Sequence, residues 1–239
     1  MTEKEVLCIQ NWSNNMETKD NLLVQALGKV GAGILLMGIL IFLPAGTFAY
    51  PQGWLMIIVL FVPMIIAGFV MLAKAPDLLR KRLTLKEERS DQKKVILFSG
   101  ILFVLVFVIS GLVFRAGRPL PFGVSLIAAA VFLCGYLLYA EVLRENAYLS
   151  RSVEVQQGQK VIDTGLYGVV RHPMYMATLL LFLSMPLILG SLLAFALMLG
   201  YIPIIVLRIR DEEKLLAEEL PGYTAYMQKV KYRLIPRIW

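Results

Sequence analysis

The only histidine of the chain, His172, lies between Arg171 and Pro173 in the stretch GLYGVVRHPMY at residues 165–175. An imidazole can transfer a proton near neutral pH, and a guanidinium fork binds carboxylates and phosphates through paired hydrogen bonds. A pair of acids, Glu212 and Glu213, follows in RIRDEEK after the uncharged run 174–207. If these two segments meet, they can recognise anions and cations and carry out acid–base chemistry.

Long apolar segments determine where these groups lie. Of 239 residues, 58% are hydrophobic and 17% are charged, which predicts an integral membrane protein. Residues 30–48, 54–73, 95–114 and 122–140 each suffice for one crossing, which needs about 20 apolar residues. The run 174–207 would span about 51 Å as one helix. It is therefore predicted to form a hairpin with its turn at Pro186, Gly190 and Ser191 and arms of about 16 residues. The expected fold is all-α and polytopic, with about six spans and no Rossmann sheet.

The basic residues are distributed very unevenly along this predicted topology. With six crossings, both termini share one side, and of the 24 Lys and Arg only Arg115 and Arg118 lie on the other. The positive-inside rule then places both termini and the RHP stretch in the cytoplasm, at the cell (inner) membrane. We divide the chain into a surface-lying or disordered leader at 1–29, four membrane helices at 30–143 and a C-terminal part at 144–239. The basic loop 74–94 is expected to attract anionic lipid headgroups. It lacks the features of a nucleic-acid site.

A hairpin returns the chain to the point where it entered the membrane, so residues 208–213 should lie near residues 171–175. Proline is favoured in the first turn of a helix, which predicts that Pro173 opens the fifth membrane helix with His172 near its N-cap. The amide groups of that helix end, together with Arg171, could hold a carboxylate or a phosphate. Residues 208–220 are expected to form an amphipathic helix whose apolar face includes Leu207, Leu215, Leu216 and Leu220.

The segment between the fourth span and the RHP stretch has a different pattern. Val153 and Val155 alternate, and Val161 follows the turn residue Gly158, which predicts a short β-hairpin or an extended lid on the membrane surface. Gly165 and Gly168 would allow a bulky group to approach the backbone closely.

Each of these features also has an ordinary explanation. The RHP stretch could serve only to anchor and start a helix, and Glu212 and Glu213 could lie on a solvated helix face. Tyrosines favour the membrane interface, so an aromatic belt could account for Tyr167, Tyr175, Tyr223 and Tyr226. One histidine and two separated cysteines do not predict a metal site. The functional interpretation rests on the concentration of all these groups at the two ends of an uncharged hairpin.

The motif DTGLYGVVRHPMY, followed after the hairpin by RIRDEEKLLAEELPGYTAYMQKVKYRLIP, resembles the isoprenylcysteine carboxyl methyltransferase family, and most of all its bacterial-type members. The resemblance covers residues 145–239. It implies S-adenosyl-L-methionine as methyl donor, bound at the cytosolic face. The cofactor-binding residues that it implies are Gln159, Gly165, Leu166, Tyr167, His172, Pro173, Tyr175, Glu212 and Glu213. The candidates for catalysis are Arg171, His172, Arg208 and Glu213.

The resemblance implies methyl transfer to a lipophilic acceptor, such as a membrane lipid or a prenylated molecule or peptide. A carboxylate acceptor is favoured because it is already ionised and needs only positioning, for which Arg171 or Arg208 is suited. An amine acceptor, as in phospholipid N-methyltransferases, would need a base such as His172 or a glutamate. The same segments are also compatible with an NADPH-dependent membrane reductase of the sterol type and with a non-enzymatic lipid-binding protein. The sequence leaves the oligomeric state open.

Overall fold

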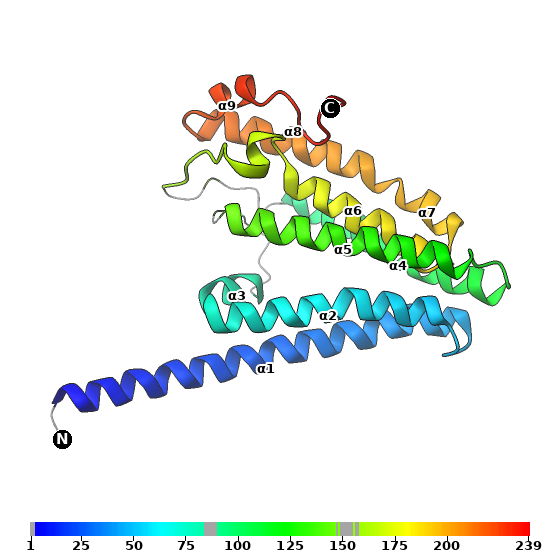
Figure 1. The fold of residues 1–239 in the computed structure, drawn as a ribbon, viewed down its shortest axis with the longest axis horizontal. Coiled ribbons are helices and arrows are strands. Elements are labelled where there is room, and N and C mark those ends of the chain that lie inside the picture. The colour runs from blue at the N-terminus through cyan, green and yellow to red at the C-terminus, as the bar shows by residue number, and fades with distance from the viewer. Residues whose placement is uncertain (1–2, 84–89, 147, 149–154, 156–157) are drawn as a thin grey trace. The chain divides into compact units, whose positions relative to one another are not determined.

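A computed structural model describes residues 3–83, 90–146, 148, 155 and 158–239. Throughout these residues the regular structure is helical and no strand occurs, so the predicted all-α fold is confirmed (Figure 1). The helices are α1 (Glu3–Ala45), α2 (Pro51–Lys74), α3 (Pro76–Leu83), α4 (Ser90–Arg115), α5 (Phe122–Glu145), the 3-10 helix η1 (Gly165–Gly168), α6 (Pro173–Ile188), α7 (Leu192–Met198), α8 (Tyr201–Glu219) and α9 (Tyr223–Lys229).

The length and hydropathy of the helices are those of an integral membrane protein. Among the described residues, five segments are long and apolar enough to cross a bilayer, and they are Asn21–Ala45, Pro51–Lys74, Leu97–Arg115, Phe122–Glu145 and Leu192–Glu219. The apolar helix α6 is shorter, at 16 residues. Together they are consistent with the expectation of about six spans.

Helix α1 extends across the expected boundary between the leader and the first membrane helix. It runs as one helix from Glu3 to Ala45. No proline interrupts residues 3–29, so nothing stops the helix before the membrane. The helix ends at Ala45, and Gly46 follows it with a φ of 70°, which suits a C-terminal cap. The basic loop 74–94 contains the short helix α3 and the start of α4, and residues 84–89 lie outside the described residues.

The predicted C-terminal hairpin is confirmed, with a correction to its turn. Pro186 lies inside α6, and the chain reverses at Gly190, whose φ is 71°. The Ser191 hydroxyl then caps α7 by accepting from the amide of Ala194 at 3.1 Å. The returning arm consists of α7 and the 19 residues of α8, and α8 continues into the helix expected at residues 208–220.

The chain forms two compact units. The first comprises Met1–Ile39 and Ile57–Lys86. Within it, Gly33 allows α1 to approach the ring of Phe61, since a Cβ added there would lie 3.2 Å from the ring. Lys29 donates to the carbonyl of Leu83 at the end of α3. These contacts hold α1, α2 and α3 together.

The second unit, Leu40–Met56 and Glu87–Trp239, contains the C-terminal hairpin. Helix α5 packs along α6, and α4 packs against α7. A core of Val106, Tyr175, Ala194, Met198, Tyr201, Ile205, Ile209 and Leu234 connects α4 with both arms of the hairpin and with the C-terminal segment. Figure 1 shows η1, the end of α8 and α9 at the same end of this unit. Apolar contacts therefore pack the hairpin up to its open end, where the polar residues of both arms lie.

Candidate active site

The buried face of α8 ends in an acid. Four residues spaced one turn apart face the interior, namely Tyr201, Ile205, Ile209 and Glu213. The face predicted from leucines alone is therefore wrong at Leu207, which is 60% exposed. Glu213 is 4% exposed, and a buried carboxylate is costly unless cations and hydrogen-bond donors compensate it.

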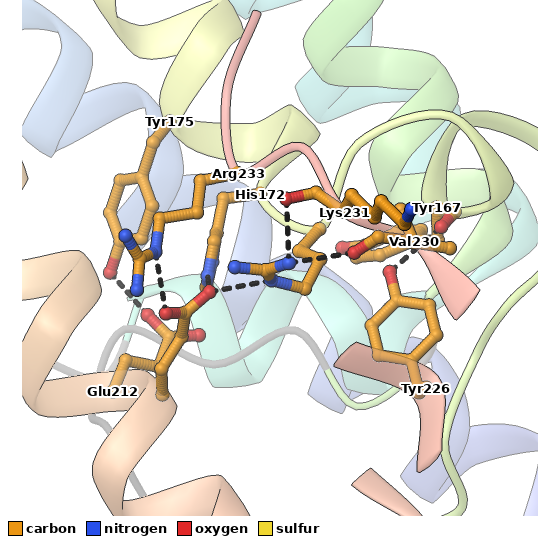
Figure 2. Close-up of polar contacts among 10 residues, drawn as sticks. Tyr167, His172, Tyr175, Glu212, Tyr226, Val230, Lys231 and Arg233 are labelled. Carbon is orange, nitrogen blue, oxygen red and sulfur yellow. Dashed lines mark hydrogen bonds and ion pairs between the residues drawn. The ribbon is translucent and has the colours of Figure 1, made fainter. Parts of the chain in front are cut away.

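Three side chains compensate Glu213. Arg171 Nε donates to Oε1 at 2.7 Å, and Arg233 Nε donates to Oε2 at 2.7 Å. His172 Nε2 lies 3.2 Å from Oε1. Because a carboxylate can only accept, Nε2 carries the hydrogen of this contact. Figure 2 shows His172 of the RHP stretch and Arg233 of the C-terminal segment on the same side of the cluster, with their contacts drawn as dashed lines. We call Glu213 with Arg171, His172 and Arg233 the buried tie.

The RHP stretch is also fixed through its backbone and through Arg171. The amides of Arg171 and His172 donate to the carbonyls of Tyr232 and Arg233 at 2.9 and 2.8 Å. Arg171 Nη1 donates to the carbonyls of Val230 and Lys231 at 2.6 and 3.0 Å (Figure 2). Arg171 is 7% exposed, so its guanidinium is buried and makes its hydrogen bonds within the protein. This geometry favours a positioning role for Arg171 over the anion-binding role expected from the sequence.

Helix α6 starts where the sequence predicts, but fewer of its backbone amides are free to bind an anion than expected. His172 is the N-cap and Pro173 is the first helical residue, as predicted. The amides of Tyr175 and Met176 donate to the His172 carbonyl at 3.1 and 3.3 Å. The amide of His172 is bonded to Arg233, as described above. Most of the donors that were expected to face an anion are therefore hydrogen-bonded within the chain.

A second polar cluster lies one residue away on α8. The Tyr175 hydroxyl donates to Glu212 Oε2 at 2.5 Å and accepts from Arg208 Nε at 3.1 Å (Figure 2 shows the first contact). Tyr175 is buried, whereas Glu212 and Arg208 are only partly buried. We call Tyr175, Arg208 and Glu212 the half-open cluster. The prediction that residues 208–213 meet residues 171–175 is confirmed by both clusters.

The loop before the RHP stretch is fastened to the end of α5. Gly165 has φ 53°, and a Cβ added there would lie 1.7 Å from Oε1 of Glu145. The Glu145 carboxylate accepts from the amide of Leu166 at 2.9 Å. The close approach that we predicted at Gly165 is therefore made by a side chain of the protein itself. The predicted β-hairpin or lid falls mainly on residues 149–154, 156 and 157, which lie outside the described residues.

Tyr167 connects η1 to two other elements. Its hydroxyl accepts from Asn146 Nδ2 at 3.0 Å, and its carbonyl accepts from the Tyr226 hydroxyl at 2.7 Å. Burial raises the pKa of Tyr167 to about 12, so its hydroxyl stays protonated at neutral pH. Tyr167 is therefore held between the end of α5 and α9, rather than exposed in an aromatic belt.

The structure brings together most of the predicted site residues and adds others. The two clusters contain Arg171, His172, Tyr175, Arg208, Glu212 and Glu213, Pro173 opens α6, and η1 holds Gly165, Leu166 and Tyr167. Gln159 is half-buried in the segment before η1. Three polar residues that sequence reasoning did not single out, Glu145, Asn146 and Arg233, make contacts that fix the site. The only signal was their place at the ends of the motif-bearing segments.

Parts of this chain are similar to known proteins. Residues 121–221 match the family described as phospholipid methyltransferase, a range that includes both clusters except Arg233. The fold is similar to that of the eukaryotic intramembrane Ras methyltransferase ICMT (isoprenylcysteine carboxyl methyltransferase). That likeness has a TM-score of 0.54 and 18% sequence identity, and it covers 99% of this chain and 88% of that chain. At this identity the likeness shows the fold.

A further relative has a different activity in its name. Delta(14)-sterol reductase from Mus musculus is 31% identical over 91 residues, which are 37% of this chain and 22% of that protein. The chain therefore spans less than a quarter of the length of this curated relative.

The fold and the two clusters define a polytopic helical membrane protein with a polar site at the open end of its C-terminal hairpin. Residues 121–221 are therefore similar to the phospholipid methyltransferase family, and the fold is similar to that of ICMT. Both similarities agree with the resemblance seen in the sequence.

Proposed function

We propose that the chain is an integral membrane enzyme that transfers a methyl group from S-adenosyl-L-methionine to a carboxylate on a lipophilic acceptor. The observation that carries this proposal is the pairing of two environments on α8. Glu213 locks the RHP stretch, α8 and the C-terminal segment together, and Glu212 beside it stays partly exposed with Tyr175 and Arg208. Such a fixed frame with one accessible acid is suited to holding a cationic cofactor.

The residues of the site fit this cofactor chemically. Glu212 can accept hydrogen bonds from an ammonium group or from ribose hydroxyls. The rings of His172 and Tyr175, whose centroids lie 5.7 Å apart, supply the π-electron density that attracts a sulfonium cation. When bound, S-adenosylmethionine would supply a methyl group activated by its positively charged sulfur. The cofactor contacts that we propose are those implied by the family resemblance, with Glu212 as their accessible acid.

The state of the two predicted bases favours a carboxylate acceptor. His172 Nε2 is directed at Glu213, and the two oxygens of Glu213 accept from Arg171, Arg233 and His172. An ammonium acceptor would have to lose a proton before it could attack, whereas a carboxylate is ionised near neutral pH. Arg208 is the candidate for holding that carboxylate. Catalysis would then rest on alignment and on the exclusion of water.

The acceptor and the orientation follow from the membrane location. A lipid or a prenylated molecule or peptide would bring its reactive end to the membrane surface, where both clusters lie at the end of the apolar hairpin. We propose that this surface is cytoplasmic, on the basis of the uneven distribution of Lys and Arg. The basic segment 74–94 would favour membranes rich in anionic lipids.

A direct experiment separates the candidate functions. Detergent-purified protein is heated with S-adenosylhomocysteine, with NADPH or with neither, and its melting temperature is compared. We expect a rise with S-adenosylhomocysteine alone, because a ligand that binds only the folded state stabilises it. A rise with NADPH alone would favour a reductase of the sterol type. No rise with either would leave a non-enzymatic lipid-binding protein.

An amine acceptor has its own support. The matched family is described as phospholipid methyltransferase, which favours an amine on a lipid headgroup. Membranes incubated with the protein and methyl-labelled S-adenosylmethionine distinguish the two reactions. A label that is released as methanol by mild base would indicate a methyl ester, and a base-stable label in a phospholipid would indicate N-methylation.

A further inference from the structure

One buried hydroxyl near the site has no hydrogen-bond partner among the residues that the structure describes. This hydroxyl belongs to Tyr223, which is 4% exposed. Buried polar groups are nearly always paired, and an unpaired hydroxyl weakens the folded state. The other unpaired buried side-chain atoms among the described residues are Gln52 Oε1 and Ser125 Oγ, which lie on α2 and α5. Tyr223 is the one that belongs to the segment carrying the family resemblance.

The packing of Tyr223 places it beside the acidic pair. It begins α9 after Gly222, whose φ of 88° turns the chain back onto α8. Tyr223 belongs to a cluster with Leu220, against which Leu216 packs. Leu216 follows Glu212 and Glu213 by about one helical turn, so these residues share one side of α8.

Its other neighbours connect Tyr223 to η1. The Tyr223 ring lies 5.6 Å from that of Tyr226, whose hydroxyl donates to the Tyr167 carbonyl. Tyr223 therefore lies between the acidic turn of α8 and the loop that precedes the RHP stretch. Burial, and secondarily the negative charges of Glu213 and Glu212, raise the pKa of Tyr223 well above its ordinary value. The hydroxyl keeps its proton and acts as a donor.

We propose that the unpaired hydroxyl of Tyr223 donates a hydrogen bond to one ribose hydroxyl of bound S-adenosylmethionine, while Glu212 accepts from the other. This assignment rests on the proposed function. A vicinal diol both accepts and donates, which matches a phenol beside a carboxylate. The carboxylate of the cofactor is a poorer match, because Glu212 and Glu213 would repel it.

The matched pair of variants is Tyr223→Phe and Tyr226→Phe. Each loses one hydroxyl and keeps its ring, but only Tyr226 has a partner for that hydroxyl. Without ligand, Tyr226→Phe lowers the melting temperature, and Tyr223→Phe leaves it unchanged or raises it. In calorimetry with S-adenosylhomocysteine, we expect Tyr223→Phe to bind roughly 3- to 10-fold more weakly than the wild type, the effect of one lost hydrogen bond.

Two ribose-modified probes test the acceptor. They are the 2′-deoxy and the 3′-deoxy forms of S-adenosylhomocysteine. We expect one of them to bind Tyr223→Phe and the wild type with equal affinity. That probe lacks the ribose hydroxyl that Tyr223 contacts, so the variant has no further bond to lose. If both probes keep the full difference between the two proteins, the ribose assignment is wrong. If the wild type and Tyr223→Phe bind the unmodified ligand equally, Tyr223 makes no contact, and the proposed function still stands. If the wild type does not bind S-adenosylhomocysteine, the proposed function fails first.

Discussion

Glu212 and Glu213 are neighbours on α8, yet they lie in opposite environments. Glu213 is 4% exposed and is compensated by Arg171, His172 and Arg233, whereas Glu212 is partly exposed and is contacted by Tyr175. Successive residues on a helix are rotated by about 100°, so one faces the core while the next reaches its edge. Glu213 therefore holds segments of the chain together, whereas Glu212 is a candidate ligand contact.

The largest expected effect comes from removing the tie. Glu213→Ala leaves the buried guanidinium of Arg171 without its carboxylate, and breaking a buried ion pair costs about 3–5 kcal/mol. We expect that loss in the free energy of unfolding, measured by denaturant titration in detergent. Glu212→Ala is the matched control and should lose less, about 1 kcal/mol, because it removes one hydrogen bond from Tyr175. Equal losses for the two variants would contradict the different roles of the two acids.

The next effect concerns the fastening of η1. Gly165→Ala combines positive φ with a Cβ that would overlap Glu145, whereas Gly158→Ala has positive φ with open space around it. Backbone strain alone costs about 1 kcal/mol, and displacing Glu145 from the Leu166 amide adds a similar amount. We therefore expect Gly165→Ala to be less stable than Gly158→Ala by about 1 kcal/mol in the same titration. Identical stabilities would show that the Glu145 contact contributes nothing.

The smallest effect is expected at the surface. Asp163 accepts from Lys229 at 2.6 Å, and this hydrogen bond lowers the pKa of the exposed carboxyl. A lowered pKa contributes stability above the unfolded-state value of about 3.9, and the contribution is lost as the pH falls toward the folded-state value. Asp163→Asn should leave the melting temperature at pH 7 almost unchanged and flatten its decline below pH 4. A marked loss at pH 7 would mean that this pair holds α9 in place.

Hydrophobicity and spacing in the sequence predicted a large part of this arrangement. The uncharged run 174–207 required a hairpin, and a hairpin brings Arg208 and the acids back to His172. The helix start at Pro173 also followed from local preference. These features depend on neighbouring residues or on one short reversal of the chain, so the sequence contains their signals.

Other contacts depend on how distant segments pack. The bonds from Glu145 to η1 and from Arg233 to Glu213 need tertiary placement that no local pattern encodes. The sequence also indicated Arg171 as an anion binder, since it does not show that the C-terminal carbonyls occupy that guanidinium. The buried face of α8 was mistaken at Leu207 because leucines marked it less well than Ile205 and Ile209.

The most direct test of the account is calorimetry of S-adenosylhomocysteine with the wild type, Glu212→Gln and Asp211→Asn. Asp211 is the exposed acid next to Glu212 on the same helix, so its variant controls for the loss of charge. We expect that Glu212→Gln folds normally and binds about 10- to 100-fold more weakly, the effect of a lost charged hydrogen bond, while Asp211→Asn binds like the wild type. Equal affinities for all three proteins would contradict the assignment of Glu212 as the ligand-facing acid.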